Sequence, residues 1–348
     1  MRIHRSLFAR IISTENLFTA WEEFCKGKQG RKDVQDFERK LEQNLFRLHR
    51  ELLAGTYRHQ PYSAFTICDP KQRRIHKASV RDRILHHAVF SVLNPIFEPT
   101  FIAHSFSCRK GKGTHRAVDA LDRMLRSVSR NATRHCFVLK CDIHQFFASV
   151  DHSVLLGILG KRVKDEKTLE LLREIIESFT ADPTICQRKG IPSGNLTSQL
   201  FANIYLNEFD QFIKHTLHIK HFVRYTDDFV VVAATQEKLR TVLSSIGSFL
   251  KERLHLDLHP HKVTIRKYRQ GIDFLGYVLL PHHRVLRTKT KRRMMRKLME
   301  RIENCKAGRL PPESVEQSLQ SYLGVLSHVD CHRLSQDIQN QCWFLLQE

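Results

Sequence analysis

Hydrophobic residues recur along the chain with two different spacings, which predicts a protein of mixed helices and strands. Residues 1–55 are expected to be helical, because Phe37, Leu41, Leu45 and Leu48 follow the period of an α-helix. Short apolar runs rich in β-branched and aromatic residues predict strands instead. Such runs lie at residues 62–68, 137–142, 222–234 and 271–277, and the basic stretch at 71–77 is expected to form a hairpin with 62–68 across a turn at Asp69-Pro70. The expected order therefore alternates between helical and extended segments.

The last part of the chain has a helical pattern with a strongly basic face. Seven lysines and arginines fall within residues 287–297, and a break follows at Gly308 to Pro312. A predicted apolar face of the first helix carries Met295, Leu298, Met299 and Ile302. We expect these helices to grip a nucleic-acid duplex through its phosphates.

Two of the predicted strands carry aspartates where the apolar run ends or turns back. Asp142 closes one run, while Asp227 and Asp228 lie between two apolar runs that read as strand, turn and strand. Taken alone, the second pair also suits an ordinary polar turn, since Asp is a favoured turn residue. Adjacent carboxylates repel each other, however, and a divalent metal ion is a natural countercharge. Together, the two strands predict a site for two Mg²⁺ ions that supports phosphoryl transfer.

Composition favours a polyanionic partner. The 348 residues include 57 Lys and Arg against 36 Asp and Glu, a formal net charge of +21. Lys and Arg neutralise phosphates, so nucleic acid is the expected partner. No long apolar run or leader-like segment is apparent, and we expect a cytoplasmic protein without a membrane partner. The nine cysteines contain no CxxC pair and predict neither a disulfide framework nor a zinc site.

These motifs resemble those of reverse transcriptases. Tyr225–Asp228 resembles their YxDD box, and Asp142–Phe147 resembles their first catalytic motif, an aspartate followed by paired aromatics. The resemblance implies an α/β (α+β) right-hand polymerase fold with fingers, a palm built on an antiparallel sheet, and a short helical thumb. The implied divisions are residues 1–134 for N-terminal helices and fingers, 135–285 for the palm with a helical insertion at about 155–190, and 286–348 for the thumb.

The same resemblance implies a set of catalytic residues. Asp142, Asp227 and Asp228, with the main-chain carbonyl of Ile143, would hold two Mg²⁺ ions, for which Mn²⁺ can substitute. Lys262 matches a lysine proposed to protonate the pyrophosphate leaving group, a general-acid role, and a plain phosphate contact is the alternative. A catalytically dead fold that only binds RNA is the rival from another class, and the three intact carboxylates argue against it.

Further residues are implied to contact the incoming deoxynucleoside triphosphate. Lys71 and Arg74 match the lysine and arginine of the fingers hairpin, with Arg73 as a competitor for the second position. Phe147 matches the aromatic that discriminates against a ribose 2′-hydroxyl. Ser193 and Gly194 match residues beside the templating base pair.

A hairpin and a loop complete the implied nucleic-acid contacts. The primer-grip hairpin would be formed by Phe274, Leu275, Gly276 and Tyr277. The basic stretch at 105–117 is not a Walker A box, because Gly113 is followed by Thr114 rather than by Lys and Ser or Thr. Its charge favours a contact with a phosphate backbone.

The box from Gly190 to Asn203 indicates a subfamily. It reads Ser193-Gly194 where most reverse transcriptases have Gln-Gly, and it reads Ser198-Gln199 where they have Ser-Pro. This GNLTSQ pattern resembles reverse transcriptases of diversity-generating retroelements, which copy a template-repeat RNA from a primer and make errors at template adenines. Their usual partner is a small basic accessory protein that forms a ring. A retron-like or phage-defence reverse transcriptase is the alternative, and in either case Ser193 and Arg74 are expected to bear on base selection.

Overall fold

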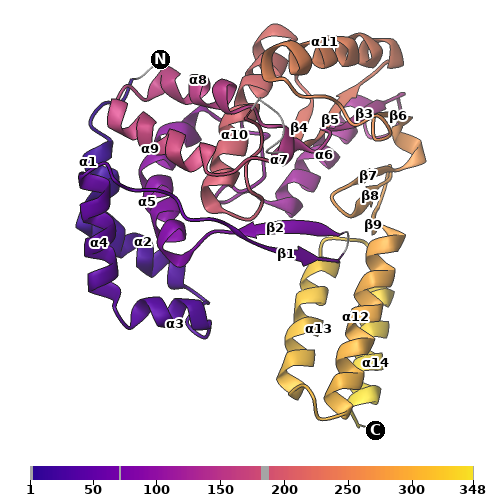
Figure 1. The fold of residues 1–348 in the computed structure, drawn as a ribbon. Coiled ribbons are helices and arrows are strands. Elements are labelled where there is room, and N and C mark those ends of the chain that lie inside the picture. Colours follow the sequence, from indigo (N-terminus) through magenta and orange to yellow (C-terminus); the bar gives the residue numbers. More distant parts are fainter. Residues whose placement is uncertain (1–2, 70–71, 182–187, 348) are drawn as a thin grey trace.

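The computed structural model describes residues 3–69, 72–181 and 188–347 of the chain. Helices and strands alternate, and every strand pair within its sheets is antiparallel, so the predicted mixed class is confirmed. Figure 1 shows the N-terminal helices on one side, the largest sheet on the other, and a separate group of C-terminal helices below that sheet.

Four helices form the N-terminal region, as the period of its apolar residues predicts. The apolar run from Phe37 is divided between two helices, because the chain turns before Leu41. The second of these helices buries Leu45 and Leu48, whereas Leu53 at its end is 60% exposed. The bounds are α1 (Phe8–Ile12), α2 (Thr14–Cys25), α3 (Lys32–Glu38) and α4 (Leu41–Leu53).

A two-stranded hairpin projects from this region across the molecule (Figure 1). Strands β1 (Ser63–Ile67) and β2 (Arg73–Lys77) pair in antiparallel register, and helix α5 (Val80–Phe97) follows directly. Beyond the end of β1, Asp69 forms an ion pair with Lys297 of the C-terminal helices. The hairpin therefore bridges two regions that are far apart in the sequence.

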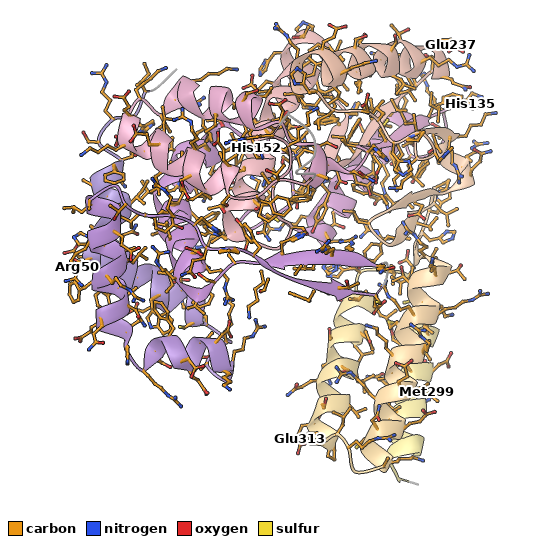
Figure 2. The ribbon with its side chains drawn as sticks, viewed as in Figure 1. Arg50, His135, His152, Glu237, Met299 and Glu313 are labelled. Atoms are coloured by element: carbon orange, nitrogen blue, oxygen red, sulfur yellow. The ribbon has the colours of Figure 1, made fainter. Side chains whose placement is uncertain are left out.

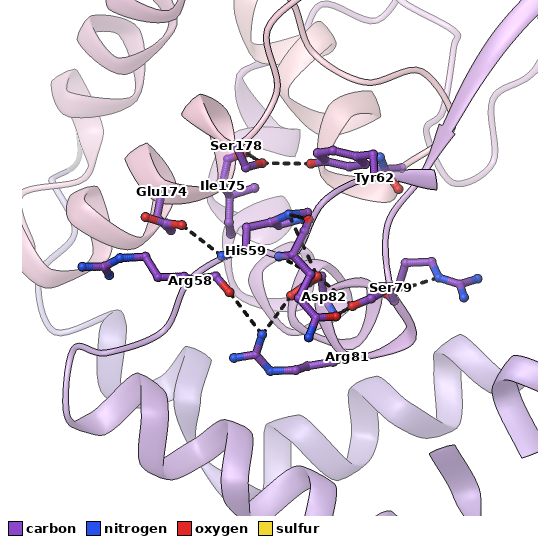
Figure 3. Close-up of polar contacts among 12 residues, drawn as sticks. Arg58, His59, Tyr62, Ser79, Arg81, Asp82, Glu174, Ile175 and Ser178 are labelled. Carbon is purple, nitrogen blue, oxygen red and sulfur yellow. Dashed lines mark hydrogen bonds and ion pairs between the residues drawn. The ribbon is translucent and has the colours of Figure 1, made fainter. Parts of the chain in front are cut away.

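Asp82 fixes both ends of this hairpin to α5. Its side chain is buried and accepts hydrogen bonds from Tyr57 Oη at 2.9 Å, Gln60 N at 3.1 Å and Ser79 Oγ at 2.7 Å. Residues 57 and 60 precede β1, and Ser79 follows β2 and caps the helix. Figure 3 shows Asp82 beside Ser79 and His59; the His59 ring stacks on Tyr62, and its backbone N–H donates to Glu174 Oε1 at 2.9 Å.

The largest sheet has four strands in the order β4-β5-β3-β6. Its two faces follow the period of a strand. On one face, Leu139, Cys141 and Phe229 belong to the core shared with the N-terminal helices. On the other face, Val138 and Val230 belong to a second hydrophobic cluster, which includes residues from the helix at 114–129 and the hairpin at 272–279. The bounds are β3 (Phe137–Asp142), β4 (Phe222–Tyr225), β5 (Asp228–Ala233) and β6 (Thr264–Lys267).

Helices cover both faces of this sheet. Contacts join α6 to β4 and β5 on one face, and α11 to β3 and β5 on the other. Two further helices, α8 and α9, lie near the insertion predicted at about residues 155–190. The bounds are α6 (Thr114–Ser129), α7 (Phe146–Ser149), α8 (His152–Arg162), α9 (Glu166–Glu177), α10 (Leu196–Gln211) and α11 (Gln236–Leu254).

A small sheet and three helices complete the chain. The helices pack on one another around Met294, Leu298 and Ile302. The apolar face predicted for α12 is therefore partly wrong: Met294 is buried, whereas Met299, labelled in Figure 2, is 38% exposed, because the buried face advances by four residues per turn. The bounds are β7 (Ile272–Phe274), β8 (Tyr277–Leu279), β9 (Arg284–Leu286), α12 (Thr288–Lys306), α13 (Pro312–Leu326) and α14 (His332–Gln347).

None of the helices in the described part of the chain is both long enough and apolar enough to cross a bilayer.

Replacing Asp82 by Ala should destabilise the fold. The change leaves three donors of the hairpin ends without their buried acceptor, and we expect a loss of about 2–4 kcal/mol in the free energy of unfolding. Urea denaturation measures it. The matched control is Asp36→Ala on α3, where the aspartate side chain is 51% exposed and its ion pair with Arg39 should contribute less than about 1 kcal/mol. Equal losses in the two variants would contradict the anchoring role of Asp82.

Candidate active site

Three carboxylates meet at one end of the four-stranded sheet. Because β3 and β5 run antiparallel in the observed register, Asp142 lies directly opposite Asp228. Asp227 lies in the turn before β5, and its carbonyl accepts a hydrogen bond from Ile143 N at 3.3 Å. The structure therefore brings together all four residues that the sequence predicts as metal ligands.

The turn that carries Asp227 has an unusual backbone. Tyr225 pairs with Asp228, so the loop between β4 and β5 consists of Thr226 and Asp227 alone. Thr226 has a φ of 53°, a left-handed conformation that is rare for a β-branched residue. Two-residue hairpin turns usually place glycine, asparagine or aspartate at such a position. Holding threonine there costs on the order of 1–3 kcal/mol, which surrounding contacts must offset.

A buried ion pair supports this turn from behind. Arg224, in β4, is fully buried and donates from Nε and Nη2 to the two carboxylate oxygens of Asp210 in α10, at 2.7 and 2.6 Å. It also donates to the carbonyl of Thr226 at 3.1 Å and to Ser105 Oγ at 2.9 Å. On the other side of the turn, Thr226 Oγ1 donates to Ser107 Oγ at 2.6 Å. We call these five residues the Arg224 network.

Burial and mutual repulsion disfavour the ionised form of Asp227 and Asp228 relative to the protonated form. Burial raises the pKa of Asp227 to about 6, and the charges of Asp142 and Asp228 add to this effect. Burial also raises the pKa of Asp228, although Lys140 opposes the shift. Both shifts have the direction expected of anions that lack a sufficient countercharge.

Two lysines partly supply that countercharge. Lys262 Nζ donates to Asp142 Oδ1 at 2.8 Å, as expected for a residue predicted to act at the site. Lys140 Nζ lies 3.7 Å from Asp228 Oδ1 and donates to the carbonyl of Asp273 at 3.1 Å. Both lysines line a cavity of about 330 Å³ that opens beside Asp142 and Asp228.

The residues present fit a divalent cation. Asp228 Oδ1 is buried without a hydrogen-bond donor among the described residues, and a positive ion would satisfy it. In the part of the chain that the structure describes, no three His, Cys, Asp or Glu side chains form a closed ligand cluster. Asp142 instead accepts from Lys262, and Asp228 lies 3.7 Å from Lys140.

The predicted nucleotide-binding residues lie where the hairpin meets the loop before α10. Ser193 Oγ donates to the carbonyl of Arg74 at 3.4 Å, and Asn195 Nδ2 donates to that of His76 at 3.3 Å. Gly194 has a φ of 104°, which is strained for any other residue, and a Cβ there would lie 3.2 Å from Ile75 Cγ2, so Ile75 would have to shift slightly to admit a side chain. Arg74 is exposed beside this contact, whereas Lys71 lies outside the described residues.

The aromatic pair after Asp142 divides between core and surface. Phe146 is buried, and Phe147 beside it is half-buried with its carbonyl accepting from Ile191 N at 2.8 Å. This contact links Phe147 to the loop that carries Ser193.

The predicted primer-grip residues form the turn between β7 and β8. Leu275 and Gly276 both have positive φ, which suits a two-residue hairpin turn. Phe274 and Tyr277 are buried in the second hydrophobic cluster. Only the turn itself is therefore available to contact a nucleic acid.

Sequence reasoning missed Lys140 and the Arg224 network. Lys140 lies two residues before Asp142 on the same strand, so the period of a strand places both on one face and was a usable signal. Arg224 stands inside the apolar run of β4, where an unpaired charge would be costly. Its partner Asp210 is in another element, and spacing alone does not identify it.

Comparison with known proteins gives a family match over more than half of the chain. Residues 68–279 match the model described as reverse transcriptase (RNA-dependent DNA polymerase). Protein YkfC of Escherichia coli (strain K12) is 27% identical over 288 residues, which cover 72% of this chain and 73% of that protein.

Two further similarities cover less of the other protein. The group II intron-encoded protein LtrA of Lactococcus lactis subsp. cremoris is 22% identical over 303 residues, or 68% of this chain and 49% of LtrA, so the chain spans about half the length of that relative. A solved structure of apo telomerase from Candida tropicalis is similar with a TM-score of 0.49 and 12% identity, covering 65% of this chain and 55% of that one.

Replacing Asp227 by Asn should stabilise the metal-free protein in a pH-dependent way. The folded-state pKa of about 6 exceeds the ordinary 3.8, so ionised Asp227 costs stability in full above pH 6, and this cost shrinks as the pH falls from 6 towards 4. We expect the variant to gain roughly 1–3 kcal/mol at pH 8 and little at pH 4.5. Urea denaturation in a chelator measures both values.

The control for this experiment is Asp257→Asn, which changes an exposed carboxylate nearby. That variant should match the original protein at both pH values. A destabilised Asp227→Asn protein at pH 8 would contradict the electrostatic account.

Proposed function

The chain belongs to the reverse transcriptase family of RNA-dependent DNA polymerases, and we propose that it copies a template-repeat RNA into cDNA within a diversity-generating retroelement. One observation carries the polymerase assignment: Asp142, Asp227 and Asp228 converge at one sheet end with Lys262 beside them. Reverse transcriptases bind a template RNA and a nucleic-acid primer, and the net charge of +21 suits both.

The carboxylates would hold the metal ions that this family uses. Asp142, Asp227, Asp228 and the carbonyl of Ile143 are the proposed ligands of two Mg²⁺ ions, which when bound would activate the primer 3′-hydroxyl and stabilise charge on the leaving pyrophosphate. Asp142 and Asp228 line the cavity of about 330 Å³ described above.

The other predicted residues would orient the substrates. Lys262 would hold or donate a proton to the leaving phosphate, once its ammonium group is released from Asp142. Exposed Arg74 would bind the triphosphate, and Lys71 belongs to the same proposal. Half-buried Phe147 would pack against the sugar, and Ser193 and Gly194 against the base pair. The turn at Leu275 and Gly276, supported by Phe274 and Tyr277, would contact the primer.

We also propose the division into fingers, palm and thumb at residues 1–134, 135–285 and 286–348. The third cluster of buried residues, which runs from Met294 to Cys342, supports a separately packed thumb.

The retroelement assignment depends on the box at residues 190–203. Ser193 is a short side chain where a long amide is usual, and its contact with the Arg74 carbonyl places it against the hairpin proposed to bind the nucleotide. A smaller side chain would constrain the base pair less, which favours errors. A small basic ring-forming accessory protein and a cytoplasmic location are parts of the same proposal.

Removal of any carboxylate should abolish polymerisation. Primer extension on an RNA template with Mg²⁺ should fall at least about 10²–10³-fold in Asp142→Ala, Asp227→Ala or Asp228→Ala, because each loses a metal ligand. Circular dichroism should show a folded protein in each case. The control Asp257→Ala removes an exposed carboxylate nearby and should retain activity. Full activity in Asp227→Ala would refute the assigned site.

Sequencing the cDNA tests the retroelement assignment. We expect errors concentrated opposite template adenines, with or without the accessory protein, and a several-fold lower error rate in Ser193→Gln because the longer side chain would restrict the base pair. Ser244→Gln on the exposed face of α11 is the matched control. Faithful cDNA from the unchanged enzyme would instead support a retron-like reverse transcriptase.

A further inference from the structure

Thr226 has a backbone conformation that threonine rarely adopts. It is β-branched, it has positive φ, and it is the first of only two residues in the loop that leads into Asp227 and Asp228. Strained residues of this kind persist when neighbouring groups fix their position, and they gather at functional sites. The position of both carboxylates therefore depends on what fixes Thr226.

One support reaches the turn through the main chain. Arg224 Nη1 donates to the Thr226 carbonyl at 3.1 Å, while Nε and Nη2 are bound by both oxygens of Asp210. The Arg224 and Asp210 side chains are both fully buried. Arg224 therefore cannot contact a substrate, and its effect on the site must pass through Thr226.

The second support reaches the turn through the threonine side chain. Thr226 Oγ1 donates to Ser107 Oγ at 2.6 Å, and Asn203 Nδ2 of α10 donates to the Ser107 carbonyl at 2.9 Å. The segment containing Ser107 lies alongside β4, because Phe106 N donates to the Arg224 carbonyl at 3.0 Å and Arg224 N to the His104 carbonyl at 3.0 Å. The segment thus acts as a short extra strand at the sheet edge.

Arg109, two residues after Ser107, holds this segment in place. The sequence predicts a phosphate contact here, yet the Arg109 side chain is only 7% exposed and pairs with Glu98 at 2.8 Å. Arg109 also donates to the carbonyls of Ile102 and Ser105, each at 2.7 Å. For Arg109 the expectation of a phosphate contact is therefore wrong, because its guanidinium folds the loop that supports Thr226.

We propose that Arg224, Asp210 and Ser107 are positioning residues that set the metal affinity of Asp227 and Asp228 by holding Thr226 in its left-handed conformation. This inference rests on the proposed function, in which those carboxylates bind divalent metal. It adds a requirement beyond the carboxylates: as long as residue 226 is a β-branched residue at positive φ, a correct metal site needs the hydrogen bond between the hydroxyls of Thr226 and Ser107.

Metal binding by the full chain, without primer or nucleotide, tests the inference. Mn²⁺ titration followed by electron paramagnetic resonance should give a roughly three- to tenfold weaker Kd in Ser107→Ala and in Thr226→Val, each of which removes the same hydrogen bond. The double variant should be no weaker than either single one. Thr226→Ser keeps the hydroxyl and should restore binding.

A glycine background separates positioning from general damage. Glycine adopts positive φ without strain, so Thr226→Gly should bind Mn²⁺ more tightly than Thr226→Val and should be insensitive to Ser107→Ala. The control Ser129→Ala removes a buried serine hydroxyl at the C-terminal end of α6, where it accepts from Ala132 N at 2.9 Å and makes no contact with the Arg224 network, and should leave the Kd unchanged.

Two results would overturn the inference. Unchanged Mn²⁺ affinity in Ser107→Ala would show that the Ser107 hydroxyl does not act on the site. If Ser107→Ala weakened Mn²⁺ binding as much in the Thr226→Gly background as in the original protein, the hydroxyl would act by a route other than Thr226. Mn²⁺ binding that survives Asp227→Ala would overturn the metal site itself, and with it the proposed function, which distinguishes that failure from the first two.

Discussion

The structure must keep three carboxylates together although they repel each other. The register of β3 and β5 places Asp142 opposite Asp228, and the shortest possible loop places Asp227 beside them. Burial makes this arrangement more costly, as the raised pKa values of Asp227 and Asp228 show. Such a cluster is stable only within a framework that cannot relax by separating the strands. The helices on both faces of the sheet provide that framework.

Features that depend on local spacing could be predicted from the sequence. The apolar runs around Asp142 and Asp228 have the composition of strands, and both strands are present with the aspartates at their ends. The same holds for the hairpin before Val80. Here the local pattern and the tertiary environment favour the same structure, so a single sequence is sufficient.

Features that depend on distant partners could not be predicted. Arg224 and Asp210 are fourteen residues apart, and Tyr57 is twenty-five residues from Asp82, so neither pair has a fixed spacing that a sequence reveals. The exposure of Met299 is another example, because the buried face of α12 is chosen by the helices packed against it. In each case the deciding information is the three-dimensional neighbour.

The ion pair between Asp69 and Lys297 ties the loop after β1 to helix α12, so the hairpin is held against the C-terminal helices (Figure 1). A phosphate that binds Lys297 would have to displace the Asp69 carboxylate. Exposed ion pairs contribute at most about 1 kcal/mol, so this displacement costs little. Lys297 would then exchange one anion, the carboxylate, for another, a phosphate. The net gain from that phosphate contact would therefore be smaller than that of a lysine without a partner.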